Sequence, residues 1–89
     1  MKIVAGTHKG RYIKSRKGNS TRPTLERIKE SLFGIIAPYV SGSKFLDLYS
    51  GTGNIALEAL SRGASKAVMI EKDPEALKII IENVNDLGF

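Results

Sequence analysis

One stretch decides the fold: Phe45-Leu46-Asp47-Leu48-Tyr49-Ser50-Gly51-Thr52-Gly53. Its first half is a short apolar run, which is typical of a buried β-strand. Its second half contains two glycines, which permit a tight turn and let other groups approach the backbone closely. The residues from Asn54 to Arg62 are rich in apolar side chains, and Gly63 then suits a helix C-terminus. The stretch therefore predicts a strand, a glycine turn and a helix in succession.

A second apolar run follows that helix and ends in an acidic residue. Residues 67–70 read Ala-Val-Met-Ile, and Glu71 stands eighteen positions after Gly53. Ligands of parallel α/β sheets bind at the carboxyl ends of the strands, where a carboxylate can accept hydrogen bonds from both ribose hydroxyls. A glycine turn after the first strand and a carboxylate after the second predict a pocket for a nucleoside cofactor.

The residues around the turn distinguish between kinds of cofactor. The P-loop pattern GxxxxGK is absent, whereas the dinucleotide pattern GxGxxA fits Gly51 to Ala56. A pyrophosphate in that turn would be repelled by Asp47 at the end of the strand. S-adenosylmethionine carries a sulfonium and an ammonium but no phosphate, so Asp47 favours this cofactor. The structural alternatives are a turn without a ligand, and a Glu71 that is simply an exposed acid at the end of the strand, with Lys72 as a potential ion-pair partner.

The rest of the chain predicts a hairpin and two further helices. Residues 2–5 and 11–14 resemble short strands around a loop with glycine at both ends. A helix should follow residues 21–24 and stop near Ile36, because the residue before Pro38 avoids helical angles. Its apolar residues recur at helical spacing and are expected to face the core. They are Leu25, Ile28, Leu32, Ile35 and Ile36.

The last helix has clear signals at both ends. Asp73 is suited to the N-cap, Pro74 to the first turn and Gly88 to the stop. Its expected buried face consists of Leu77, Ile80, Ile81, Val84 and Leu87. The order strand, helix, strand, helix is the opening of a doubly wound α/β domain. Two parallel strands leave free edges, so we expect self-association through them.

Charge is concentrated in the first third of the chain. The 89 residues carry a net charge of +5, and residues 1–30 hold nine of the fourteen Lys and Arg but only two of the nine acidic residues. Clustered basic charge attracts polyanions such as nucleic acids, although a basic surface exposed only to water is as good an interpretation. His8, the only histidine, is expected to be solvated, and no metal site is predicted.

Composition excludes several classes of protein. The chain has no cysteine, so it has no disulfide, thiol nucleophile or thiolate metal site. No apolar run approaches the roughly 18 residues of a membrane span, and the N-terminus has no signal-peptide pattern. These features favour a cytoplasmic protein without a membrane partner.

Four segments together carry a family resemblance. They are Lys2-Ile-Val-Ala-Gly-x-x-x-Gly-Arg, Thr21-Arg-Pro-Thr-x-x-x-x-Lys-Glu-x-x-Phe33, Leu46-Asp-Leu-Tyr-Ser-Gly-Thr-Gly and Leu57-Glu-Ala-Leu-Ser-Arg-Gly-Ala. In these segments the chain closely resembles the RsmD family of 16S ribosomal RNA guanine-N2 methyltransferases, over essentially its whole length. The resemblance implies an α/β fold: the N-terminal half of a class I, Rossmann-like methyltransferase that depends on S-adenosylmethionine. Residues 1–20 would form a basic β-hairpin and loop, and residues 21–89 a helix and the start of the Rossmann-like domain.

The resemblance also implies a role for each matching position. The cofactor's first motif would be Asp47, Ser50, Gly51, Thr52 and Gly53. Glu71 would bind the ribose with Lys72 beside it, and Thr21, Arg22 and Thr24 would lie near the methionine end of the cofactor. Small-subunit ribosomal RNA or its assembly particle would meet the basic hairpin and loop through Lys9, Arg11, Lys14, Arg16 and Lys17.

One family motif is missing from these residues. The family's catalytic Asn/Asp-Pro-Pro-Tyr run, which follows the fourth core strand, does not occur here. That run holds the target amine in line with the methyl group, and such positioning is most of what methyl transfer needs. We therefore expect a parent protein that methylates a guanine N2, and an 89-residue chain that binds cofactor and RNA without useful activity. The alternatives are an RNA-binding module on a methyltransferase-like scaffold and a NAD-type dinucleotide-binding fragment.

Overall fold

The computed structural model describes residues 1–15, 23–48 and 50–89, without the side chains of Pro23 and Thr24. Its elements in chain order are α1 (Pro23–Val40), β1 (Lys44–Asp47), α2 (Asn54–Ser61), β2 (Lys66–Met69) and α3 (Pro74–Leu87). The two strands pair in parallel, with Lys44 opposite Lys66 and Asp47 opposite Met69. The predicted succession of strand, turn, helix, strand and helix is therefore confirmed.

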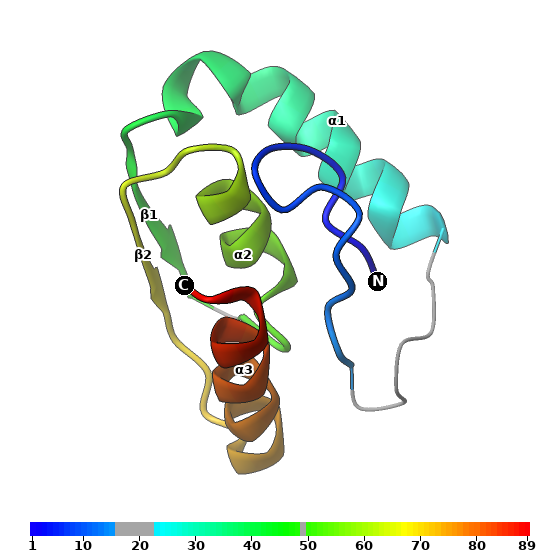
Figure 1. The fold of residues 1–89 in the computed structure, drawn as a ribbon, viewed down its shortest axis with the longest axis vertical. Coiled ribbons are helices and arrows are strands. Elements are labelled where there is room, and N and C mark those ends of the chain that lie inside the picture. The colour runs from blue at the N-terminus through cyan, green and yellow to red at the C-terminus, as the bar shows by residue number, and fades with distance from the viewer. Residues whose placement is uncertain (16–22, 49) are drawn as a thin grey trace.

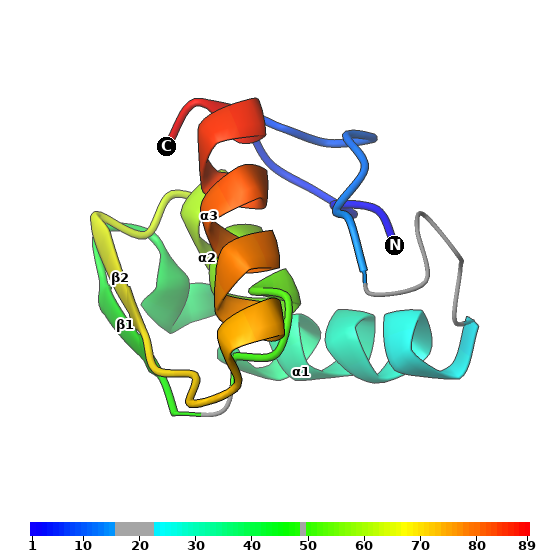
Figure 2. The same ribbon diagram turned by 90° about the horizontal axis from the view of Figure 1, so that it is seen from below.

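Helix α2 lies at the centre of the molecule. Figures 1 and 2 show it between the two-stranded sheet and the N-terminal segment, with α3 on the same side of the sheet. One side of α2 contributes Leu57 to a cluster with Ile3, Ile13 and Leu87. The other side contributes Ala59 to a cluster with Phe33 and Val40, against which Phe45 of β1 packs. Helix α2 therefore joins the N-terminal segment, the sheet and both outer helices into one core.

The predicted hairpin is reduced to a single bridge. Lys2 and Tyr12 form an isolated antiparallel bridge, and the Ile3 amide donates to the Arg11 carbonyl at 2.9 Å. The Gly10 amide also donates to the Ile3 carbonyl at 2.8 Å, but the next two amides, of Val4 and Ala5, donate to the Glu58 carboxylate of α2 instead of to the opposite arm. The N-terminal segment, residues 1–15, is thus held both by backbone hydrogen bonds between its two arms, such as Ile13 N–H to the Met1 carbonyl at 2.7 Å, and by the Glu58 side chain of α2.

Helix α1 runs past the predicted stop. It continues through Pro38 to Val40, so the prediction of an end near Ile36 was wrong. A proline in the last turn removes only the bond to the carbonyl of Gly34, and Gly34 is exposed, so water can bond to that carbonyl instead. Continuing the helix buries Val40, which is 4% exposed in the core beside Phe33. The apolar burial outweighs the local preference of the residue before proline.

Of the predicted apolar stripe of α1, only Ile36 packs against the core. Leu25, Ile28, Leu32 and Ile35 are 36–76% exposed, and the inward face carries Lys29, Phe33 and Val40. Two predicted core residues of α3 are exposed as well, and so are apolar residues along and just after both strands. These further exposed residues are Leu46, Leu48, Val68, Ile70, Leu77 and Ile81. Periodicity identified apolar faces correctly, but the described residues contain no element that covers them.

We expect the 89-residue chain to self-associate through these apolar faces and the free edges of its sheet. Ile35→Lys places a charge at the most exposed residue of the α1 stripe and should shift sedimentation equilibrium toward the monomer. Glu30→Gln changes the net charge equally at an exposed position outside the stripe, and should leave the association unchanged. A wild-type chain that stays monomeric at every concentration would contradict this expectation.

Within the described residues, none of the helices is both long and apolar enough to cross a bilayer.

Candidate functional site

The glycine turn closes directly over the ends of both strands. The Ser50 amide donates to the Ile70 carbonyl at 3.1 Å, and the Gly53 amide donates to the Ser50 carbonyl at 2.8 Å. Gly51 and Gly53 adopt φ of +57° and +86°, which side chains other than glycine rarely adopt. The two glycines of the sequence motif are therefore required by the backbone of this turn.

The two glycines face different surroundings. A Cβ at Gly53 would lie 3.2 Å from Met69 Sδ and 3.3 Å from Leu57 Cδ1, so this glycine allows the turn to pack on the core. A Cβ at Gly51 would have nothing within 4 Å. Gly51 therefore borders open space, where a ligand can lie against the backbone.

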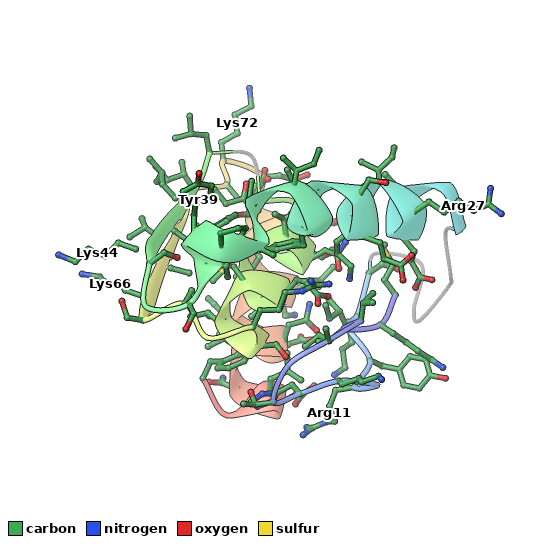
Figure 3. All side chains as sticks on the ribbon, turned by 90° about the horizontal axis from the view of Figure 1, so that it is seen from above. Arg11, Arg27, Tyr39, Lys44, Lys66 and Lys72 are labelled. Carbon is green, nitrogen blue, oxygen red and sulfur yellow. The ribbon has the colours of Figure 1, made fainter. Side chains whose placement is uncertain are left out.

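Glu71 reaches the turn, as the sequence spacing predicted. Its Oε1 accepts a hydrogen bond from the Gly51 amide at 2.8 Å, and its Oε2 accepts one from the Asp73 amide at 3.0 Å. Each carboxylate oxygen has a second lone pair, so both can still accept a hydroxyl. Lys72 is exposed and extends away from the fold (Figure 3).

The other predicted cofactor residues divide into two groups. Asp47 is half-buried at the carboxyl end of β1, and Ser50 is 7% exposed with its hydroxyl 3.4 Å from the Asp47 carbonyl. Thr21 and Arg22, and the side chain of Thr24, lie outside the described residues. In the described group, an open glycine, a carboxylate with lone pairs left to accept and an acidic strand end lie at one edge of the sheet.

Sequence reasoning missed two buried polar side chains that hold this turn. Asn83 of α3 is 1% exposed and donates from Nδ2 to the Thr52 carbonyl at 3.0 Å. Lys29 of α1 is fully buried and donates from Nζ to Asn54 Oδ1 at 3.0 Å. The available signal was a polar residue at a core position of an amphipathic helix, since Asn83 lies one turn from Ile80 and Leu87.

Lys29 belongs to a buried ion-pair network that fixes the N-terminal segment. Its Nζ lies 3.0 Å from Glu58 Oε1, and both side chains are fully buried. Arg62 Nε lies 2.8 Å from Glu58 Oε2, and the Val4 and Ala5 amides complete the shell of the carboxylate at 2.9 and 3.1 Å. Burial raises the pKa of Glu58, but the hydrogen bonds from Val4, Arg62 and Lys29 outweigh it and hold the pKa below the usual value.

This pKa predicts loss of stability in acid. Unfolded Glu has a pKa of about 4.3, so between that value and the lower folded value the unfolded chain binds the extra proton. The contribution of Glu58 to stability is complete above pH ~4.3 and disappears as pH falls through its folded pKa. Urea unfolding between pH 6 and 3 should show this decline, and the Glu58→Gln variant should show a smaller one. Equal declines in the two proteins would contradict it.

The basic residues of the N-terminal segment are only partly free to meet a polyanion. Lys9 is exposed, and Arg11 is exposed while its Nη2 donates to the Asp86 carbonyl at 2.9 Å. Lys14 Nζ lies 3.3 Å from Asp86 and 3.7 Å from Glu82, so acidic groups offset its charge. Figure 3 shows Arg11 pointing away from Lys44 and Lys66, at the far side of the fold. Arg16 and Lys17 lie outside the described residues.

His8 is not simply solvated, as was expected. Its Nε2 lies 2.7 Å from the Leu87 carbonyl, and its ring lies 4.3 Å from that of Phe89. The tip of the N-terminal segment therefore rests on the C-terminal end of α3. Among the described residues no group of three or more His, Cys, Asp or Glu could hold a metal ion. A separate depression of about 290 Å³ is lined by Gly6, Ala37, Val40 and Arg62, none of them from the glycine turn.

Comparisons with known proteins relate the whole chain to one family. A sequence model of one family, described as conserved hypothetical protein 95, matches residues 1–89. YlbH of Bacillus subtilis, named as a candidate rRNA methyltransferase, is 40% identical over 98% of this chain and 47% of its own length. Ribosomal RNA small subunit methyltransferase D of Haemophilus influenzae is 36% identical over 98% of this chain and 45% of its own length.

A solved structure extends the likeness to the fold. The candidate methyltransferase yhhF from Escherichia coli superposes with a TM-score of 0.86 and 33% identity, over 99% of this chain and 47% of its own. The chain thus spans about half the length of the relatives it matches. Its fold is the N-terminal part of a Rossmann-like methyltransferase, and the chain belongs to the RsmD family of RNA methyltransferases.

Proposed function

We propose that the chain is the cofactor-binding and RNA-contacting half of a methyltransferase that uses S-adenosylmethionine to methylate a guanine N2 in small-subunit ribosomal RNA. This proposal rests on one observation at the carboxyl edge of the sheet: Gly51 borders open space while its amide donates to the Glu71 carboxylate. A cytoplasmic location follows from this substrate, which is the free RNA or a particle assembling around it.

The described residues have distinct roles in this proposal. Gly51 lets the cofactor lie on the backbone, Glu71 accepts its ribose hydroxyls, and Asp47 attracts its positively charged methionine end. Thr21, Arg22 and Thr24 would lie near that end. S-adenosylmethionine supplies an activated methyl group on its sulfonium. Lys9 and Arg11, with the basic residues up to Lys17, would draw the RNA phosphates toward the site.

We propose that the RNA contacts made by these 89 residues are to the phosphate backbone and do not distinguish between bases. Lys9 and Arg11 offer exposed cations, which position a phosphate backbone but do not read bases. Because Glu82 and Asp86 offset Lys14, its contribution to phosphate binding is smaller. The residues that orient the target amine are expected in the family's Asn/Asp-Pro-Pro-Tyr motif, which these 89 residues do not contain. The chain alone is therefore proposed to be inactive.

Gly51→Ala tests the cofactor site. The new Cβ would occupy the open space beside the turn, so we expect the affinity for S-adenosylhomocysteine to fall about tenfold or more, which is about 1.4 kcal/mol. Equilibrium dialysis measures this directly. Gly42→Ala is the matched control, since Gly42 also has positive φ and open surroundings but lies in the turn before β1. Equal affinities in the two variants would contradict the proposed site.

A chimera tests the reaction itself. Residues 1–89 would replace the matching segment of the Haemophilus influenzae relative, and labelled methyl transfer to small-subunit RNA would be followed by nucleoside analysis. The proposal expects N2-methylguanosine from the chimera and no product from the 89-residue chain. A folded, inactive chimera would favour the alternative of an RNA-binding module. Enhanced NADH fluorescence on binding would favour a dinucleotide-binding fragment.

A further inference from the structure

Asn83 holds two separate parts of the molecule with one buried carboxamide. Its Oδ1 accepts a hydrogen bond from the Lys14 amide at 2.8 Å, and its Nδ2 donates to the Lys14 carbonyl at 3.1 Å. The remaining Nδ2 hydrogen goes to the Thr52 carbonyl of the glycine turn at 3.0 Å. One side chain therefore bridges the basic N-terminal segment and the proposed cofactor turn.

The chemistry of this bridge is specific to an amide. Two carbonyl acceptors and one amide donor surround the side chain, and asparagine alone matches them with two hydrogens and one oxygen at this length. In an aspartate, a carboxylate oxygen would replace Nδ2 and would face the Lys14 and Thr52 carbonyl oxygens with no hydrogen to donate. An apolar residue would remove the partner of one donor and two acceptors in this partly buried region, which is costly. The bridge at Asn83, which is 1% exposed, thus depends on its carboxamide and not on its volume alone.

A second bridge runs from the N-terminal segment to the other end of the turn. Lys29 donates from Nζ to the Lys2 carbonyl at 2.7 Å and to Asn54 Oδ1 at 3.0 Å. Asn54 is the first residue of α2 and directly follows Gly53. Residues 52–54 are therefore connected to the segment on two sides, through Asn83 to Lys14 and through Lys29 to Lys2. A displacement of the segment must alter the turn, or break buried hydrogen bonds.

We infer that Asn83 is a positioning residue that couples RNA binding at the basic segment to cofactor binding at the glycine turn. This inference rests on the proposed function. A cofactor that orders the turn fixes the Thr52 carbonyl, and through Asn83 it fixes the backbone of Lys14. Such coupling is reciprocal, so RNA must favour the cofactor by the same factor. The first ligand to bind loses the conformational entropy of the turn and the segment, so the second ligand binds to parts that are already ordered.

The test compares RNA affinity with and without S-adenosylhomocysteine. The probe is a fluorescein-labelled RNA hairpin with an unpaired guanine in its loop, and the readout is anisotropy. In the wild-type chain we expect the cofactor product to tighten RNA binding about fivefold or more. In Asn83→Ala the ratio of the RNA affinities with saturating S-adenosylhomocysteine and without it should fall to about one, even where the lost bridge weakens the binding of each ligand alone. Asn85→Ala is the control, because Asn85 is exposed on the same helix.

A second measurement needs no variant. Amide hydrogen exchange at Lys14, whose amide donates to Asn83, should slow when S-adenosylhomocysteine binds at the turn. Protection confined to the turn, or an undiminished ratio in Asn83→Ala, would overturn the coupling. If the wild-type chain binds both ligands but its RNA affinity is the same with and without S-adenosylhomocysteine, the coupling is overturned and the proposed function is not. A chain that binds neither ligand would overturn both the coupling and the proposed function.

Discussion

Glu58→Gln should lower the free energy of unfolding by about 3–5 kcal/mol, the range for breaking a buried ion pair by removing one partner. Lys29 would remain fully buried with its charge uncompensated, and the Gln amide hydrogens would oppose the Val4 or Ala5 amide. Small domains are stable by about 5–15 kcal/mol, so this single change removes a large share of the total. Urea unfolding followed by circular dichroism measures the difference.

Glu30→Gln is the matched control for this result. Glu30 is adjacent to Lys29 in the chain but exposed, and exposed acids change stability by less than about 0.5 kcal/mol. A loss below about 1 kcal/mol in Glu58→Gln would be inconsistent with a buried network that holds the N-terminal segment.

Gly6→Ala should detach the N-terminal segment from α2. Gly6 has φ +90°, and its Cβ would collide with the backbone carbonyl of Ser61. Positive φ costs about 1–2 kcal/mol for an alanine, and the collision should add about 1–3 kcal/mol. The neighbouring bonds would also be strained, including the Thr7 amide to the Ser61 carbonyl at 2.8 Å. Thermal unfolding and the amide shifts of residues 7 and 8 both report the change.

Gly10→Ala separates the two contributions. Gly10 has φ +85° but nothing within 4 Å of the Cβ position, so this variant should lose only the free energy that positive φ costs an alanine. We expect Gly6→Ala to be the less stable of the two variants, and equal losses would show that the close approach to Ser61 is unimportant.

Much of the fold could be predicted because its signals are local. The turn residues Gly51 and Gly53, the cap at Asp73 and the stop at Gly88 each act within a few residues, and all were found where expected. The helix end at Pro38 was predicted wrongly because burial of Val40 overrode the local preference. The buried faces of α1 and α3 were also wrong in part, since periodicity cannot say which apolar face meets a neighbour.

The candidate site shows the same division. The approach of Glu71 to the turn followed from spacing alone, because parallel strands bring their carboxyl ends together. The burial of Asn83 had a signal in its spacing from Ile80 and Leu87, but its partners and those of Lys29 and Glu58 could not be predicted, since they are contacts between residues far apart in the chain. A charged or amide residue on a helix reads as exposed until its partners are known. Lys29 and Glu58 lie in two of the segments that carry the family resemblance, and there they hold the N-terminal segment against α2.

The most direct test of the central claim is a titration of the isotope-labelled 89-residue chain with S-adenosylhomocysteine, followed by amide chemical shifts. We expect shifts centred on residues 47–54 and on Glu71, with the Gly51 amide prominent because Glu71 accepts its hydrogen bond. A folded chain whose amides in these two segments do not shift would contradict the proposed cofactor site.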